Sequence, residues 1–179
     1  MRRPVSRRHF LGALAAAGTV GGRSRRLLAR AAGGRQLSFV HTHTGERLVV
    51  EYFGGGGYVP DALATVDHFL RDFRTGGVHP IDPALLDLLH RVTRLTETIR
   101  PFQVISGYRS PATNDMLRHR SEGVAAGSLH MQGQAIDVRL ADVPLVGLRK
   151  AALAIGRGGV GYYPASDFVH VDTGRVRTW

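Results

Sequence analysis

The sequence contains no cysteine among its 179 residues, which excludes disulfide bonds, thiolate metal ligands and a cysteine nucleophile. Stability must therefore rest on a hydrophobic core and on any metal that the folded chain binds. Hydrophobic residues make up 43% of the chain, which is an ordinary fraction and is enough for such a core. With a short leader removed, this length predicts one domain, which we place at residues 37–179.

Acidic residues are missing from residues 1–31, although eight arginines lie there. Those arginines account for +8 of the net charge of +10, so the rest of the chain carries about +2. A domain so close to neutrality lacks the basic surface that binding to a polyanion requires. We therefore expect no nucleic-acid partner.

The apolar stretch near the N-terminus, Leu11–Val20, is too short to span a bilayer as a transmembrane helix. It follows Ser6-Arg7-Arg8-His9-Phe10-Leu11, a pattern typical of twin-arginine export signals, and a fortuitous basic N-terminus is the alternative. We predict that residues 1–31 are such a signal, with a cleavage site near Ala31. The twin-arginine translocase would then carry the folded domain to the periplasm or extracytoplasmic cell envelope. We expect the mature protein to have no membrane span.

The glycine run Gly54–Gly57 lacks the lysine and the helix that follow a phosphate-binding loop, which excludes nucleotide binding there. We expect this run to be a flexible connector. Residues 37–53 before it alternate as a β-hairpin that turns at residues 44–46. The first strand places His41 and His43 on one face. Such a pair could bind a metal. We favour the alternative that the two histidines form a polar strand face or contact the ligands of another site.

Residues 60–74 and 82–99 have apolar side chains at helical spacing, and both segments open with an aspartate and proline pair. The later sequence predicts a strand at 101–106, helices at 111–120 and 143–155, and a strand at 160–163. Long helices that precede a set of short strands indicate an α+β fold. We expect a small antiparallel sheet that is packed against several helices.

Two stretches in the C-terminal half carry the residues on which the functional prediction depends. They are residues 128–137 (Ser-Leu-His-Met-Gln-Gly-Gln-Ala-Ile-Asp) and residues 167–172 (Asp-Phe-Val-His-Val-Asp). Strand alternation puts Asp137 on one face with Arg139, and His170 on one face with Asp172. Two strands that present polar side chains on one face of a small sheet can hold a metal ion.

His130, Asp137 and His170 are predicted to bind one Zn²⁺ and to leave its fourth coordination position open for water. Zinc lowers the pKa of bound water from about 16 to about 7, so an open site supplies a hydroxide nucleophile at neutral pH. Mn²⁺ or Fe²⁺ also suits these ligands. A structural metal fits less well, because structural zinc usually has four protein ligands, most of them thiolates.

Arg109 lies in Gly107-Tyr-Arg109-Ser-Pro111, directly after the predicted strand at 101–106. A turn with glycine and proline at a strand end places this arginine at the rim of the sheet, where clefts usually form. Its guanidinium is expected to clamp a carboxylate or to stabilise an oxyanion. A structural pair with an aspartate is the alternative.

The motif Ser-x-His-x-x-Gly-x-Ala-x-Asp, followed by Asp-x-x-His, resembles that of the zinc D-alanyl-D-alanine peptidases and related murein endopeptidases. The resemblance extends over residues 37–179, and residues 107–111 and 174–179 make it closest to the MepK-like branch. It implies a Hedgehog or D-Ala-D-Ala peptidase-like fold, with Arg109 beside the metal. It also implies that Asp167 is the general base, because related enzymes carry Glu or Asp there. A turn-capping role is the alternative for Asp167.

Two further residues are predicted to support the ligands without binding the metal. They are Ser128 and Asp172, although Asp172 could also replace Asp137 as a ligand. The resemblance implies a zinc metallopeptidase that cleaves peptidoglycan stem peptides or cross-links, and we favour an endopeptidase over a D,D-carboxypeptidase. A non-catalytic peptidoglycan-binding domain is the alternative from another class. Asp167 discriminates between them, because a binding domain needs no general base.

Overall fold

The computed structural model describes residues 33–120 and 124–179, so the predicted export signal lies outside the described residues. One sheet of eight strands runs through the described chain in the order β3-β2-β1-β4-β5-β7-β6-β8. The strands are β1 (Arg35–His41), β2 (Arg47–Gly54), β3 (Gly57–Tyr58), β4 (Phe102–Ser106), β5 (Ala135–Leu140), β6 (Gly159–Tyr163), β7 (Phe168–Asp172) and β8 (Arg177–Thr178). The helices are α2 (Pro60–Phe69), α3 (Pro83–Thr96), α4 (Pro111–Arg120) and α5 (Leu145–Ala154), with short 3₁₀ helices η1 (Leu129–Gln132) and η2 (Pro164–Ser166).

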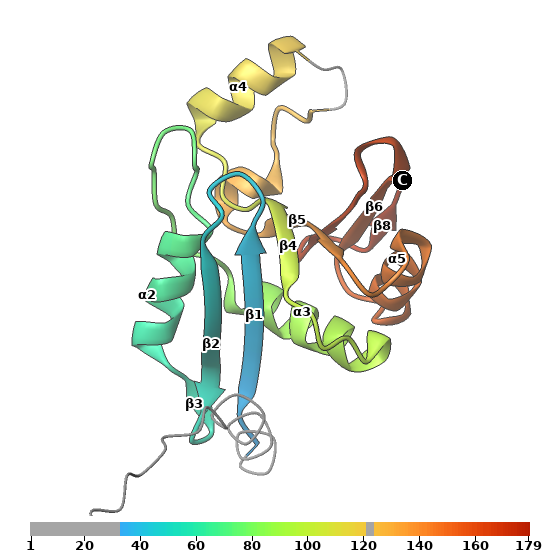
Figure 1. Cartoon of the computed structure of the whole chain (residues 1–179). Coiled ribbons are helices and arrows are strands. Elements are labelled where there is room, and N and C mark those ends of the chain that lie inside the picture. Colours follow the sequence, from blue (N-terminus) through green and yellow to red (C-terminus); the bar gives the residue numbers. More distant parts are fainter. Residues whose placement is uncertain (1–32, 121–123) are drawn as a thin grey trace, which may run out of the picture.

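The predicted α+β class is confirmed, and the sheet is larger than the small antiparallel sheet that we expected. Most neighbouring strands are antiparallel, but β1 is parallel to β4 and β6 is parallel to β8. The chain passes through β2, α2 and α3 before β4 returns beside β1 (Figure 1). A long connection of this kind allows two neighbouring strands to run parallel.

The two faces of the sheet differ in character. Helices α3 and α5 lie against one face, where α3 buries five side chains: Leu85, Leu86, Leu88, Leu89 and Val92. Alternation along β5 and β7 directs Val138 and Val169 into this core. Asp137 and His170 therefore point to the opposite face, which is the face that carries the polar site.

The glycine run at residues 54–57 is a tight turn rather than the flexible connector that we expected. Phe53 pairs with Tyr58 across it, so β2 and β3 form a hairpin. Gly55 and Gly56 have φ angles of +60° and +87°. Positive φ at both central residues suits the twist of a two-residue hairpin turn, and glycine adopts it most easily.

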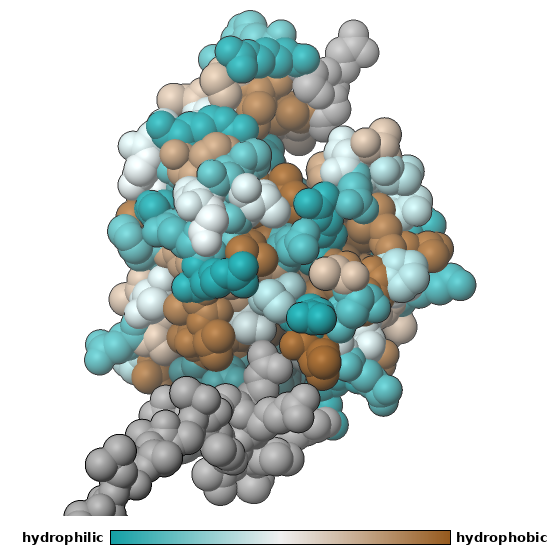
Figure 2. Space-filling view, viewed as in Figure 1, coloured by the Kyte–Doolittle hydropathy of each residue, from teal (hydrophilic) through white to brown (hydrophobic). Residues whose placement is uncertain are grey.

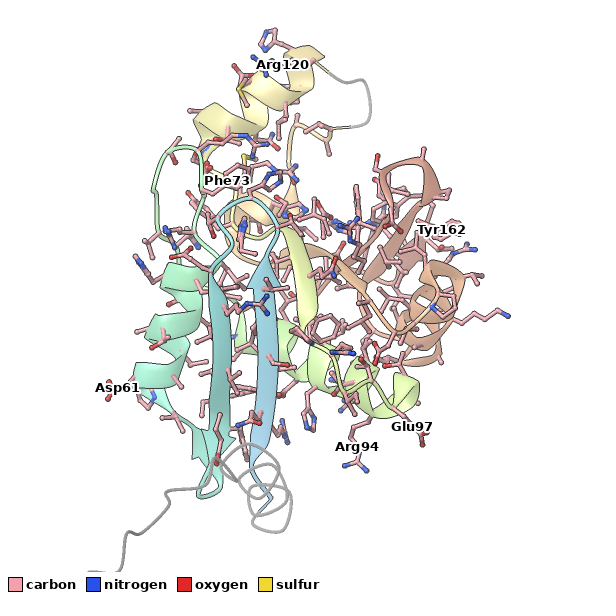
Figure 3. All side chains as sticks on the ribbon, viewed as in Figure 1. Asp61, Phe73, Arg94, Glu97, Arg120 and Tyr162 are labelled. Atoms are coloured by element: carbon pink, nitrogen blue, oxygen red, sulfur yellow. The ribbon has the colours of Figure 1, made fainter. Side chains whose placement is uncertain are left out.

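Helix α2 ends at Phe69 instead of residue 74, because Asp72 organises a turn. Its carboxylate accepts hydrogen bonds from the backbone N–H groups of Arg74 and Ser110. The predicted start of α3 is confirmed, since Asp82 caps its first turn. The helix stops before Glu97, whose φ of +53° is incompatible with a right-handed helix (Figure 3). No helix among the described residues is both long and apolar enough to cross a membrane.

Candidate metal centre

Three polar side chains from separate elements meet on the face of the sheet that is opposite α3 and α5. Asp137 and His170 are direct partners in the antiparallel β5–β7 ladder, so the strand register places them side by side. His130 comes from η1 and reaches them because Gly133, at a φ of +66°, turns the chain into β5. A side chain at Gly133 would collide with the Pro80 carbonyl, so only glycine fits this turn.

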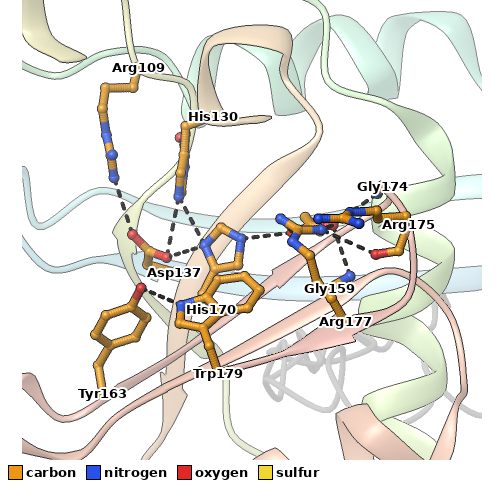
Figure 4. Close-up of polar contacts among 12 residues, drawn as sticks. Arg109, His130, Asp137, Gly159, Tyr163, His170, Gly174, Arg175, Arg177 and Trp179 are labelled. Carbon is orange, nitrogen blue, oxygen red and sulfur yellow. Dashed lines mark hydrogen bonds and ion pairs between the residues drawn. The ribbon is translucent and has the colours of Figure 1, made fainter. Parts of the chain in front are cut away.

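The potential ligand atoms of these residues form a tight triangle (Figure 4). His170 Nδ1 lies 2.9 Å from Asp137 Oδ1 and 3.2 Å from His130 Nε2. His130 Nε2 lies 3.3 Å from Asp137 Oδ1. Tetrahedral zinc with bonds of about 2.0–2.1 Å has ligand–ligand distances of roughly 3.3–3.4 Å. The three residues, all of them buried, therefore fit one zinc ion.

The outer nitrogen of each imidazole is held by the protein, which orients the inner nitrogen. His130 Nδ1 lies 2.7 Å from the carbonyl oxygen of Gly107. His170 Nε2 lies 3.0 Å from Asp172 Oδ2. An N–H group at each outer position donates to these oxygens and leaves a lone pair on the inner nitrogen, which is the form that binds a metal.

Asp172 is buried behind His170 and is fully used as an acceptor. Its Oδ1 accepts from the backbone N–H groups of Gly159 and Gly174 and from Arg177. Its Oδ2 accepts from Arg177 and lies against His170. These contacts favour the predicted supporting role of Asp172 over direct metal binding.

The buried carboxylates make this centre favourable for positive charge. Burial disfavours ionisation of Asp137, but His130 and His170 hold its pKa well below the ordinary value. Burial also disfavours charge on His170, yet hydrogen bonds to Asp137 and Asp172 raise its pKa to about 9. Burial lowers the pKa of His130. A cation bound between these residues would thus be stabilised by charge as well as by geometry.

Arg109 contacts the carboxylate oxygen of Asp137 that lies outside the triangle. Its Nη2 is 3.3 Å from Asp137 Oδ2 and 3.2 Å from Ser106 Oγ, and its backbone N–H donates to the carbonyl of His130. Burial lowers the pKa of Arg109, and Asp137 opposes this shift. The structure therefore contains the arginine–aspartate pair considered above, and it also places Arg109 at the wall of a pocket.

Asp72, which no motif in the sequence singles out, anchors the segment that carries Arg109. Its buried carboxylate accepts from the hydroxyl and the backbone N–H of Ser110, at 2.6 and 2.9 Å. The backbone N–H of the neighbouring Tyr108 donates to the carbonyl of Leu70. The loop after α2 thus binds both neighbours of Arg109, Tyr108 and Ser110, and so fixes the backbone position of Arg109.

Replacing Asp72 with asparagine is expected to lower the free energy of unfolding by about 1–3 kcal/mol at pH 7, because buried donors lose a charged acceptor. Burial disfavours this charge, but hydrogen bonds from Ser110 outweigh burial and hold the pKa of Asp72 below its ordinary value. The stabilisation is therefore fully present above the unfolded pKa of about 3.9, and it is lost progressively as the pH falls from there through the lower pKa of the folded state. Urea unfolding of both proteins at pH 7 and pH 3 measures the effect. An equally large difference at pH 3 would contradict this role.

Ser128 and Asp167 lie beside the metal centre in different ways. Ser128 is buried, precedes η1 and lines the pocket. Asp167 is not brought into the triangle, because its carboxylate lies 2.9 Å from Arg139 Nη1 and its side chain is 64% exposed. Its neighbours Ser166 and Phe168 do line the pocket. Asp167 thus stands at the pocket rim with its carboxylate against Arg139.

The triangle opens into a pocket of about 510 Å³. Helix α4 and residues 124–129 form one side, and β6, η2 and the C-terminal residues form the other; Figure 2 shows a hollow between these parts. Tyr163, Phe168 and Trp179 give the pocket an aromatic wall. Tyr163 shares a strand face with Gly161, the partner of His170, but alternation alone does not reveal that β6 and β7 are neighbours. Trp179 belongs to the stretch 174–179 that contributes to the family resemblance, but no sequence pattern places its indole at the pocket.

His41 and His43 belong to a separate aromatic cluster. His43 stacks on Phe73 at a centroid distance of 4.3 Å, and the buried ring of His41 meets Phe69 and Phe73 edge-on. Within residues 33–120 and 124–179, the triangle above is the only group with metal-binding geometry. These two histidines therefore contribute to packing.

Known proteins resemble this chain over most of its length. The sequence profile of the family described as peptidoglycan L,D-endopeptidase MepK matches residues 29–179. The chain is 50% identical over 145 residues to peptidoglycan L,D-endopeptidase MepK of Escherichia coli strain K12, covering 81% of this chain and 80% of that protein. It is 47% identical over 146 residues to the probable peptidoglycan L,D-endopeptidase MepK of Haemophilus influenzae, covering 81% and 78%. Among solved structures, the Serratia marcescens L-Ala D-Glu endopeptidase ChiX matches with a TM-score of 0.38 at 22% identity, covering 52% of this chain and 80% of that chain.

Proposed function

The chain belongs to the peptidoglycan L,D-endopeptidase MepK family, and we propose that it hydrolyses L,D-peptide bonds in peptidoglycan with one Zn²⁺ bound by His130, Asp137 and His170. The observation that carries this proposal is the triangle of buried ligand atoms at the floor of the pocket. A site with three protein ligands and one open side suits catalysis, because structural zinc usually has four protein ligands.

When bound, zinc would polarise the scissile carbonyl and activate a water molecule for attack on it. The residues of the chain orient this chemistry. Asp172 and the Gly107 carbonyl hold the imidazoles of His170 and His130, so that both inner nitrogens face the same point. Arg109 holds the carboxylate of Asp137 and presents its guanidinium to the pocket, where it can bind a carboxylate of the substrate.

Asp167 is our candidate for the general base, which takes the proton of the attacking water and passes it to the leaving amine. Its place three residues before His170 and its pocket-lining neighbours support this role. The exposed ion pair with Arg139 stabilises the observed side-chain position by only about 0–1 kcal/mol. The carboxylate can therefore turn from Arg139 toward the pocket at small cost.

Replacing Asp167 with asparagine is expected to lower kcat by about 10²–10⁴-fold, the usual contribution of a general base, while one zinc per chain stays bound. Arg139→Gln is the control, because it releases the carboxylate and should leave kcat nearly unchanged. Chromatography of released muropeptides gives kcat, and mass spectrometry of the metal gives the zinc content. An Asp167→Asn protein with wild-type kcat would remove Asp167 from the mechanism.

Digestion of purified peptidoglycan by the zinc-loaded protein, with mass analysis of the products, tests the proposed function. We expect new fragments whose ends identify an L,D bond as the bond that is cleaved. Release of terminal D-alanine alone would instead support the D,D-carboxypeptidase alternative. A protein that binds zinc stoichiometrically and yields no products would support a peptidoglycan-binding domain.

A peptidoglycan substrate lies outside the cytoplasmic membrane, so the proposed function requires an extracytoplasmic location. We propose export of the folded domain by the twin-arginine translocase. The Ser6-Arg7-Arg8-His9-Phe10-Leu11 stretch supports this route. Fractionation of expressing cells tests it, and a protein that remains entirely in the cytoplasm would contradict it.

A further inference from the structure

Tyr163 lies at the end of β6 and presents its phenol to the pocket. Gly161 on the same strand pairs with His170, so alternation places Tyr163 on the face of the metal centre. Tyr162 lies on the opposite face, where it packs against the core and the Arg149 guanidinium covers its ring at 5.1 Å (Figure 3). The two adjacent tyrosines therefore face different surroundings.

The indole of Trp179 holds the Tyr163 hydroxyl in place. Trp179 Nε1 donates a hydrogen bond to the Tyr163 oxygen at 2.7 Å (Figure 4). The indole lies directly over Gly161, where an added Cβ would come within 2.7 Å of the ring. Its centroid is 5.3 Å from that of His170. Trp179 thus connects the end of β6 to the metal centre, and Figure 4 shows the hydroxyl pointing toward Asp137.

The Tyr163 hydroxyl has a proton to donate, because its oxygen accepts the hydrogen bond from Trp179. No described residue accepts that proton within hydrogen-bond distance. Arg109 binds Asp137 through Nη2 and is assigned above to a carboxylate of the substrate, and the guanidinium of Arg177 is engaged by Asp172. A phenol is also more acidic than a serine hydroxyl, which makes it the better donor to a negatively charged oxygen.

We propose that Tyr163 is a further catalytic residue, whose hydroxyl donates a hydrogen bond to the carbonyl oxygen of the scissile bond, and that Trp179 positions this hydroxyl. The inference rests on the proposed peptidase function. When the water oxygen bonds to the carbonyl carbon, the π electron pair moves onto the carbonyl oxygen, and Tyr163 stabilises this charge without giving up its proton. When the C–N bond breaks, that pair re-forms the carbonyl and the amine leaves with the proton released by the water.

Tyr163→Phe removes only the hydroxyl, and Tyr162→Phe is the matched control on the opposite face of β6. With the zinc-loaded protein and a purified cross-linked muropeptide, Tyr163→Phe is expected to lower kcat by about 10²–10³-fold, the usual loss for one oxyanion donor. KM and zinc content should change little, and Tyr162→Phe should keep the wild-type kcat. An active enzyme whose kcat is unchanged by Tyr163→Phe would overturn the proposal.

A double variant tests the positioning role of Trp179. Trp179→Phe removes the N–H donor and is expected to lower kcat by about tenfold in the wild type. It should lower kcat no further in Tyr163→Phe, because Trp179 acts through the hydroxyl that is already missing. If Trp179 only packs against the substrate, its replacement would raise KM equally in both backgrounds, and this result would overturn the positioning role.

A tetrahedral inhibitor separates this proposal from the peptidase function itself. Calorimetric titration of the zinc-loaded protein with a phosphinic pseudodipeptide, whose charged oxygen replaces that of the attacked carbonyl, requires no turnover. Tyr163→Phe is expected to weaken its binding by about 10²-fold. The same weakening in a protein that digests no peptidoglycan would show that the Tyr163 hydroxyl binds the charged oxygen, and it would refute the peptidase function. Unchanged inhibitor binding would overturn the role of Tyr163.

Discussion

Replacing His130 with alanine is expected to abolish zinc binding and to lower peptidoglycan hydrolysis by at least about 10⁴-fold. His130 would supply one of only three ligand atoms, and its Nε2 lies within 3.3 Å of the other two. Loss of the metal removes several kcal/mol of transition-state stabilisation together with the activated water. Mass spectrometry of the metal and chromatography of released muropeptides measure the two effects.

His119→Ala is the matched control, because that side chain lies on α4 and is 78% exposed. It is expected to keep one zinc per chain and the wild-type rate. Because His130 is buried, thermal unfolding of both variants must show that the chain still folds. A folded His130→Ala protein that binds one zinc as tightly as the wild type would contradict the proposed ligand set.

Replacing Asp172 with alanine is expected to lower the free energy of unfolding by about 3–5 kcal/mol and to weaken zinc affinity by about 10–100-fold. The buried carboxylate accepts from two backbone N–H groups and from the guanidinium of Arg177. Its removal leaves these donors without their acceptor and leaves the charge of Arg177 uncompensated. It also releases the imidazole of His170, whose orientation depends on Asp172.

Asp115→Ala provides the comparison, because Asp115 is 64% exposed and its ion pair with Arg118 spans 3.7 Å. Such a surface pair contributes little, so the expected change in unfolding free energy is within about 0.5 kcal/mol. Urea unfolding measures stability, and competition with a chelator of known affinity measures zinc binding. If Asp172→Ala matches Asp115→Ala in both measurements, Asp172 has neither role.

Local patterns predicted the strands of the site better than they predicted the sheet. Alternation around Asp137 and His170 is enough to place each residue on a polar face, and the structure pairs these two residues directly. Alternation does not specify which strands become neighbours, because that choice depends on packing between distant segments. The parallel pairing of β1 with β4 and the full width of the sheet therefore did not follow from the sequence.

The end of α2 shows why apolar periodicity can extend a helix too far. Phe73 continues the helical spacing of the preceding residues, but in the structure it lies beyond α2 and stacks on His43. The turn that ends the helix depends on Asp72, whose main partner, Ser110, is 38 residues away in the chain. A contact at that separation leaves no local sequence signal.

Asp167 illustrates a similar limit within the motif itself. The pattern Asp-x-x-His gives the spacing of Asp167 from His170. The direction of its carboxylate depends instead on the backbone of Asp167, whose φ is +52°, and on the contact with Arg139. Strand alternation stops at Phe168, where β7 begins, so it does not specify this direction. The motif therefore predicts that Asp167 lies near His170, but it does not predict that the carboxylate contacts Arg139.

Titration of the metal-free protein with zinc tests most directly whether one ion at the triangle of His130, Asp137 and His170 drives hydrolysis. The protein is stripped with a chelator, and the rate of muropeptide release is followed as zinc is added. We predict that the rate rises linearly from zero and reaches its maximum at one equivalent per chain. Full hydrolysis without metal, or a rate that rises only after a first equivalent has bound, would contradict this prediction.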